Sequence, residues 1–174
     1  MQISKSDYML FLRHPAWLWL KKHARHLLPP VDPALQARFD EGHAFEPYAE
    51  ALFADLVRLG FSDFAGYQAL TSLTQETWRS GASAVAQGRY EDGQITCICD
   101  IVSRDGDGYV LTEIKSGTSA KPEHVFDLAF QRVVLEAAGF PIIRCEVAHV
   151  NRDYVRAGEI DAAGLVAITD ITEK

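Results

Sequence analysis

The chain has 174 residues, and 48% of them are hydrophobic, which is enough for one domain with a buried core. Its formal net charge of −7 argues against simple electrostatic adhesion to nucleic acid, but a bound metal ion would supply positive charge locally. No apolar run approaches the ~18–20 residues that span a membrane. Asp7, Arg13 and His14 interrupt the apolar start, so we expect neither a membrane segment nor a signal peptide, and we expect a cytoplasmic location.

The N-terminal segment is predicted to be helical over residues 4–27. Either serine at its start is a suitable N-cap, and Pro15 is expected to kink or restart the helix. Trp17 and Trp19 are expected to anchor the core rather than to stack on a ligand.

A second helix is predicted over residues 32–59, because Gly60 is a suitable residue to end it. The following residues, 61–70, are expected to be short and extended. A small helix is then predicted over residues 72–81, with Ser72 in a sequence typical of a capping box.

From residue 82 the hydrophobic period changes to two, which is typical of strands. The predicted elements are strands over 83–90, 94–103 and 108–116, a helix over 121–139 and a strand over 141–150. No structure is predicted for the tail after residue 150. This order indicates an α/β fold, with a central mixed β-sheet flanked by helices, in a single domain over residues 1–174. The three cysteines are too few for a disulfide framework, and Cys97 and Cys99 are expected to be core residues on one face.

Two carboxylates and a lysine lie in the second predicted hairpin. If its turn has two residues, Asp100 faces Glu113 directly, with Cβ atoms ~4.5–5.5 Å apart, and Lys115 points to the same face. Opposed carboxylates repel, and a divalent cation relieves that repulsion, since Mg²⁺ and Mn²⁺ prefer hard oxygen ligands. A solvated hairpin face with surface ion pairs is the alternative, although the flanking residues are apolar.

The hairpin residues also suit hydrolysis of a phosphodiester. A metal ion held by two carboxylates lowers the pKa of a bound water. The ammonium group of Lys115, two residues along the strand, would steady the developing charge or orient that water.

Asp100, followed by Glu113-Ile114-Lys115, resembles the D…(D/E)-x-K signature of the PD-(D/E)XK nuclease superfamily, with Cys99 where a proline often stands. Three further segments resemble its RecB-like members.

Gly42 and Glu46 resemble a G-x-x-x-E helix, for which His43 is an alternative metal ligand. Gln131 resembles the glutamine of a Q-x-x-x-Y helix, in which Leu135 replaces the tyrosine. The start of the chain resembles that of iron–sulfur RecB-like nucleases, but His14 replaces the first cluster cysteine, so we expect no iron–sulfur cluster.

The resemblance implies a restriction-endonuclease-like core and an Mg²⁺- or Mn²⁺-dependent nuclease, with exonuclease activity and a larger nuclease or DNA-repair assembly among the expectations. It implies that Asp100, Glu113 and the carbonyl of Ile114 bind metal, and that Glu46 completes or supports the site in a shared pocket. Lys115 would then serve the nucleophile and transition state, and Gln131 would orient Lys115 or the substrate. DNA is the favoured partner.

Two other functions remain open from the sequence. One is a catalytically inactive nucleic-acid-binding or regulatory module with the nuclease fold. The other is a purely structural α/β domain of a larger complex, in which the hairpin carboxylates are solvated.

Overall fold

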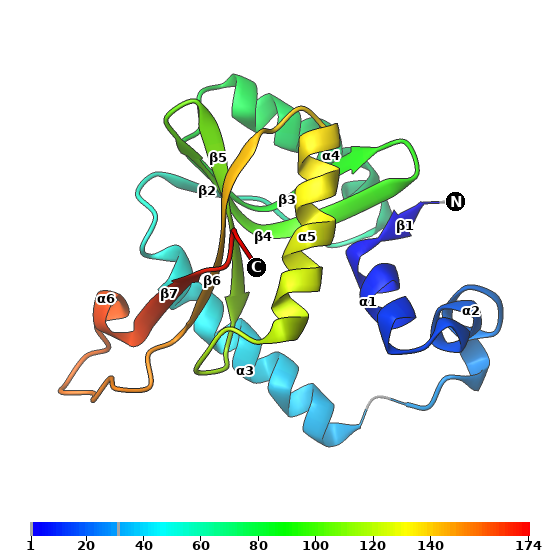
Figure 1. The fold of residues 1–174 in the computed structure, drawn as a ribbon, viewed down its shortest axis with the longest axis horizontal. Helices are drawn as coiled ribbons and strands as arrows, with labels where there is room; N and C mark the ends of the chain where they lie inside the picture. The colour runs from blue at the N-terminus through cyan, green and yellow to red at the C-terminus, as the bar shows by residue number, and fades with distance from the viewer. Residues whose placement is uncertain (1, 31) are drawn as a thin grey trace.

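The computed structural model describes residues 2–30 and 32–174, which form a mixed β-sheet flanked by helices, as predicted (Figure 1). The elements of the first half are β1 (Ile3–Ser4), α1 (Lys5–Arg13), α2 (Pro15–His23), a 3₁₀ turn η1 (Arg25–Leu27), α3 (Pro33–Glu50), β2 (Leu56–Arg58) and α4 (Phe64–Arg79). The elements of the second half are β3 (Ala84–Asp92), β4 (Ile95–Asp105), β5 (Gly108–Lys115), α5 (Pro122–Ala137), β6 (Ile142–Val150), α6 (Ala162–Leu165) and β7 (Val166–Asp170). Within the described ranges, no helix combines the length and the apolar character that a membrane crossing needs.

The described strands form one seven-stranded sheet in the order β2-β3-β4-β5-β6-β7, and β1 pairs with β4 outside this order. The β1–β4, β2–β3 and β5–β6 pairs are parallel, and the other neighbours are antiparallel. The predicted strands, and the helix between the third and fourth of them, are confirmed as β3, β4, β5, α5 and β6. The tail, for which nothing was predicted, adds α6 and edge strand β7.

Helices cover both faces of the sheet. Trp78 from α4 and Leu135 from α5 are buried in one core, and Figure 1 shows α5 crossing in front of the strands. Phe45 and Ala49 from α3 are buried in a second core with Ile101 of β4. Strands β4 and β5 therefore lie between two apolar layers, and a charged side chain within them must find a partner inside the protein.

One edge of β4 is shared by two strands. Ile95 and Thr96, at its start, pair with β1, whereas its residues from Ile101 onward pair with β5. The first residue of α1, Lys5, follows β1 directly and lies beside Cys97 in the intervening stretch. The sheet thus has a gap on this edge of β4, and the start of α1 adjoins it.

Side-chain alternation changes phase in the middle of β3 and β4. Cys97, Cys99 and Val102 all lie in one core. Strict alternation would place residue 101, not Val102, on the same face as Cys99, so the strand has one extra residue between Cys99 and Val102. The β3–β4 pairing keeps its register throughout but skips Gln87 and Asp100, and Gln87 has a φ of 57°. Both strands therefore depart from alternation at the same level. As a result, Asp100 belongs to neither of the two apolar faces of the sheet.

The two strand cysteines are confirmed as core residues on one face. Cys97 and Cys99 are 2% and 0% exposed, and their Sγ atoms are 3.6 Å apart. Cys145 is also buried, and all three are free thiols.

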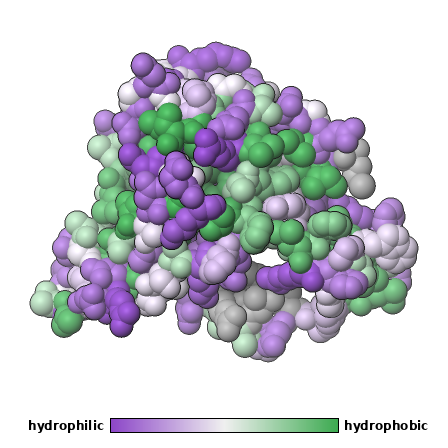
Figure 2. All heavy atoms as spheres, in the orientation of Figure 1, coloured by the Kyte–Doolittle hydropathy of each residue, from purple (hydrophilic) through white to green (hydrophobic). Residues whose placement is uncertain are grey.

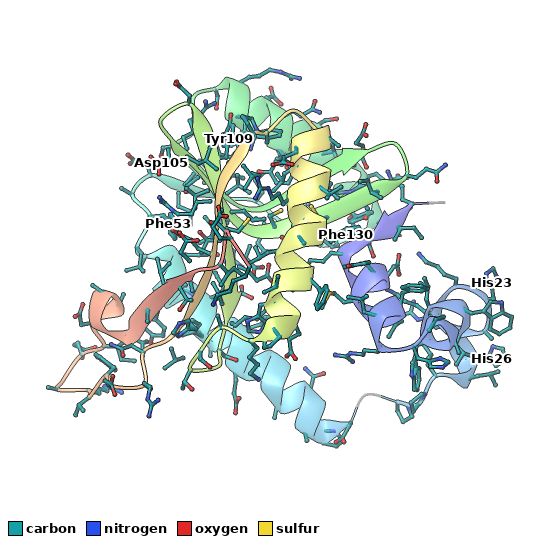
Figure 3. All side chains as sticks on the ribbon, in the orientation of Figure 1. His23, His26, Phe53, Asp105, Tyr109 and Phe130 are labelled. Atoms are coloured by element: carbon teal, nitrogen blue, oxygen red, sulfur yellow. The ribbon has the colours of Figure 1, made fainter. Side chains whose placement is uncertain are left out.

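The prediction for the N-terminal segment is partly wrong. The helix does restart at Pro15, giving α1 and α2 instead of one kinked helix. Trp17 and Trp19 are 39% and 58% exposed and do not anchor the core, because α2 packs on α1 rather than on the sheet. Tyr8 of α1, rather than either tryptophan, packs the N-terminal segment against α5. Its ring stacks on that of Phe130 with the centroids 5.0 Å apart, and Figure 3 shows Phe130 between α5 and α1.

The predictions for residues 32–81 are also wrong in their boundaries. The helix that was expected to reach residue 59 ends at Glu50, because Leu56–Arg58 pair with β3, and this long-range pairing outweighs local helix propensity. One helix, α4 (Phe64–Arg79), covers most of the segments 61–70 and 72–81, and Asp63 caps it by accepting a hydrogen bond from the Gly66 N–H at 2.7 Å.

Two serines, one at a helix N-cap and one inside a helix, give opposite predictions for substitution by alanine. Ser4 caps α1 in a reciprocal capping box with Asp7, whereas Ser72 lies exposed inside α4. We expect Ser4→Ala to lower the free energy of unfolding by ~1 kcal/mol. Ser72→Ala should raise it by ~0.5 kcal/mol, because alanine favours a helix interior. Urea denaturation measures both, and equal signs would contradict the assignment of the caps.

Candidate active site

The predicted hairpin register is confirmed, but it ends just before the two carboxylates. Ile101 pairs with Thr112, and the β4–β5 ladder runs from there to the turn. At the next position Asp100 and Glu113 are not a ladder pair. Instead the Ile114 N–H donates to Asp100 Oδ2 at 2.8 Å, and β5 continues beside β6. The Asp100 carboxylate thus takes the place of a backbone acceptor where β4 and β5 part.

Glu113 is 1% exposed and is held by three donors. Lys5 Nζ lies 3.0 Å from its Oε1 and 3.2 Å from its Oε2. Lys115 Nζ donates to Oε1, and Gln131 Nε2 donates to Oε2 at 2.7 Å. A charged carboxylate at this depth is stable only because ammonium and amide groups surround it.

Asp127 adds a third carboxylate to the cluster. Its Oδ1 accepts from Gln131 Nε2 at 3.0 Å, and its oxygens lie 3.4 Å from the ammonium groups of both Lys5 and Lys115. Two lysines therefore lie among three carboxylates, those of Asp100, Glu113 and Asp127. Gln131 Oε1 is buried and has no hydrogen-bond partner among the described residues.

The two hairpin carboxylates have opposite pKa shifts. Burial, followed by the charge of Glu113, raises the pKa of Asp100 to about 6, against the attraction of the nearby lysines. Burial alone would raise the pKa of Glu113 as well, but the ammonium groups of Lys5 and Lys115 lower it well below its usual range. Glu113 is therefore ionised, and its negative charge disfavours the ionised form of Asp100.

The solvated hairpin face is excluded by this burial. Water does not reach the carboxylate of Glu113, and its partners come from α1 and α5 as well as from β5. The apolar neighbours in the sequence, which argued against a solvated face, indicated the burial correctly.

Glu46 and His43 lie in a pocket of about 580 Å³ that is also lined by Gln87. Arg58 Nη2 binds Glu46 at 3.1 Å. Gln87 connects this pocket to the site, because its Nε2 donates to Asp100 Oδ1 at 3.4 Å. Asp100 does not itself line the pocket, so the expected sharing of one pocket with Glu46 is only indirect.

The described residues contain no group of three or more His, Cys, Asp or Glu side chains placed to hold one metal ion. The structure therefore brings together Asp100, Glu113, Lys115 and Gln131, but it does not add Glu46 or His43 as a further ligand. Leu135, at the tyrosine position of the Q-x-x-x-Y pattern, is fully buried and contributes to the core instead.

Sequence reasoning missed Lys5, Asp127 and Gln87. The spacing of four between Asp127 and Gln131 placed both on one face of α5, and this was a signal that was available. Lys5 is 108 residues from Glu113, and no local pattern links them. Gln87 is the residue opposite Asp100 in the β3–β4 register, but its positive φ has no signal in the sequence.

No protein-family model matches this sequence, and no curated protein is significantly similar to it.

The raised pKa of Asp100 predicts how Asp100→Asn changes stability with pH. Its folded pKa of about 6 lies above its ordinary 3.8, so the folded state holds the proton more tightly and wild-type stability falls as pH rises between these values. Asp100→Asn does not lose stability in this way, because asparagine does not ionise. We expect Asp100→Asn to be more stable than wild type by roughly 3 kcal/mol at pH 7 and to lose that advantage by pH 4. Urea denaturation in EDTA at several pH values measures the difference.

Two variants serve as controls for that series. Asp92→Asn removes an exposed carboxylate from the end of β3 and should change stability little at any pH. Glu113→Gln should destabilise by ~3–5 kcal/mol at pH 7, because it leaves two lysines without their main partner. A pH-independent gain in Asp100→Asn would contradict the assigned cause.

Proposed function

We propose that the chain is a metal-dependent nuclease domain with a restriction-endonuclease-like core, hydrolysing phosphodiester bonds, with DNA favoured by the sequence resemblance. One observation carries the proposal. The Ile114 N–H binds the Asp100 carboxylate where β4 and β5 part, the charge of Glu113 helps to raise the pKa of Asp100, and Lys115 is held on Glu113. The mixed sheet with helices on both faces supports the fold assignment.

The donor set fits Mg²⁺ or Mn²⁺ bound largely by water. Asp100 and Glu113 are hard oxygen donors, and one or two carboxylates are enough for Mg²⁺, which keeps several waters. The Glu113 charge that raises the pKa of Asp100 is a repulsion that a cation relieves. With two carboxylates and the carbonyl of Ile114 as ligands, Glu46 is assigned a supporting role, since Arg58 holds it in the adjoining pocket.

The bound ion would supply Lewis acidity and a water of lowered pKa. Lys115 contributes positive charge beside it, because Glu113 and Asp127 raise its pKa above the usual value despite burial. That charge would stabilise the negative charge developing on the phosphoryl oxygens. Gln131 is a positioning residue in this scheme, since its amide holds Glu113 and Asp127, the two carboxylates that hold Lys115.

The N-terminal helices support nucleic acid as the substrate. Residues 3–27 contain five Lys or Arg and one acidic residue, although the whole chain is acidic. Phe11, Trp17 and Trp19 are exposed among them, and Figure 2 shows hydrophobic and hydrophilic side chains interspersed at the right of the view, over α1 and α2. Aromatic rings that stack on bases, with cations that attract phosphate, are typical of surfaces that bind single strands.

A pocket connects α1 to the site. It has a volume of about 680 Å³ and is lined by Leu12 and Arg13 from α1, by Phe126 and Asp127 from α5, and by Lys115. A nucleotide in this pocket would lie beside Lys115, with Arg13 available to its phosphate and Phe126, 51% exposed, available to its base.

One observation favours the inactive module as a second candidate. Glu113 is already satisfied by Lys5, Lys115 and Gln131 without a metal ion. A module that binds nucleic acid without cleaving it would keep this closed cluster permanently. Titration with Mn²⁺ separates the two functions, because only the nuclease proposal requires Asp100-dependent binding of the ion.

The proposal predicts Mn²⁺- or Mg²⁺-dependent cleavage of DNA that EDTA abolishes. Lys115→Met should lower the cleavage rate at least ~100-fold without weakening Mn²⁺ binding, because an ammonium group is not a metal ligand. Asp100→Asn should lose both. Linear and circular, single- and double-stranded DNA are the substrates to compare, with product formation followed on gels.

The control for that assay is Lys174→Met, which removes an exposed lysine at the C-terminal end and should cleave like wild type. Cleavage that persists in EDTA, or a Lys115→Met variant that cleaves normally, would refute the proposed roles. Absence of both cleavage and Mn²⁺ binding in the wild type would refute the metal-dependent nuclease itself.

The exposed tryptophans give a separate prediction. Trp19→Ala should weaken binding of single-stranded oligonucleotide, measured by fluorescence anisotropy in EDTA, by ~1–3 kcal/mol. Its stability should change little, because Trp19 is 58% exposed. Phe64→Ala is the matched control, since Phe64 is 72% exposed but lies on α4. Equal losses in both variants would exclude a specific role for α2.

A further inference from the structure

Lys5 reaches Glu113 from a different part of the sheet. Strand β1 pairs Ser4 with Thr96 of β4, and a capping box at Ser4 then starts α1 at Lys5. The Lys5 side chain is 22% exposed, and its Nζ lies within 3.2 Å of both oxygens of Glu113. Among the donors that bind Glu113 in the described residues, Lys5 alone contacts both oxygens.

The acceptor capacity of Glu113 is fully used. An ionised carboxylate offers about four lone-pair positions. Oε1 accepts from Lys5 and Lys115, and Oε2 accepts from Lys5 and Gln131. A metal ion therefore cannot bind Glu113 until one of these donors leaves it.

We infer that Lys5 is the donor that the metal ion displaces, so that Lys5 is a built-in cation competing for Glu113. This inference rests on the proposed nuclease function. Lys5 bridges both oxygens as an ion would. After displacement its ammonium group would keep an ion pair with Asp127, whose Oδ1 is 3.4 Å from Lys5 Nζ. Lys115 is attached two residues along the same strand, and Gln131 carries no charge for the ion to repel.

Competition of this kind stabilises the metal-free protein and weakens its affinity for metal. In the absence of an ion, Lys5 and Lys115 offset the charges of Asp100 and Glu113, which would otherwise repel each other in a buried site. When an ion binds, the ammonium group of Lys5 becomes a like charge close to it, and the affinity falls. Displacement of Lys5 thus links occupancy of the site to the start of α1.

The test compares Mn²⁺ binding by wild type, Lys5→Met and Lys22→Met, with free Mn²⁺ followed by electron paramagnetic resonance. Lys22 is the matched control, because it also binds a buried carboxylate, Asp7 at 2.6 Å, with 21% of its side chain exposed. We expect Lys5→Met to bind Mn²⁺ with a Kd at least about tenfold lower than wild type. Lys22→Met should keep the wild-type Kd.

Melting temperatures give a second readout. Metal-free Lys5→Met should melt lower than metal-free wild type, and its rise on adding Mn²⁺ should be larger. If Lys5→Met does not fold, Lys5→Gln removes the same charge, keeps a donor and takes its place. An unchanged or higher Kd in the folded variant overturns the competition.

The outcomes separate this inference from the proposed function. Wild type that binds Mn²⁺ and cleaves DNA, with no tighter binding in Lys5→Met, overturns the competition alone. Absence of Mn²⁺ binding in every variant overturns both, because the ion then has no site at Glu113 with or without Lys5.

Discussion

The buried charge of Glu113 is the constraint on which the arrangement around the site depends. A carboxylate that is 1% exposed needs partners inside the protein, and here they come from three elements: Lys115 from β5, Lys5 from α1, and Gln131 from α5. The same interactions fix α1 and α5 against the sheet, together with the stack of Tyr8 on Phe130. The apolar cores hold the layers in place, but this cluster determines how the first helix meets the sheet.

The second constraint is the geometry of the strands. Because β4 and β5 stop pairing after Ile101 and Thr112, the Ile114 N–H is free to bind Asp100, whose pKa the charge of Glu113 helps to raise although the two residues are not a ladder pair. The left-handed conformation of Gln87 changes the phase of β3 at the same level. Irregular backbone of this sort costs of order 1–3 kcal/mol, and it is concentrated at functional sites.

Much of the fold could be predicted because its signals are local. The period of two over residues 82–116 arises because successive side chains of a strand point to opposite faces of the sheet, and the two-residue turn sets the register of the pairs from Ile101–Thr112 to Asp105–Gly108. The helical segments before residue 82 were less predictable. Strand β2 pairs with β3 across 28 residues, and the exposure of Trp17 and Trp19 depends on α2 having no sheet face to pack on. Neither fact is encoded in a short window.

The candidate site, like the fold, could be predicted where its signals are local but not where its contacts are long-range. Turn length fixed the hairpin register as far as Ile101 and Thr112, and strand alternation put Glu113 and Lys115 on one face, so Asp100 was expected beside them although its final position depends on the change of phase opposite Gln87. The sequence by itself also placed Gln131 on the helix that follows. Only the tertiary structure brought Lys5 to Glu113 and Asp127 into the cluster, and only it placed Glu46 with Arg58 in an adjoining pocket. The physical reason is that a buried charge selects its partners by distance in the folded chain, and those distances depend on how every layer packs.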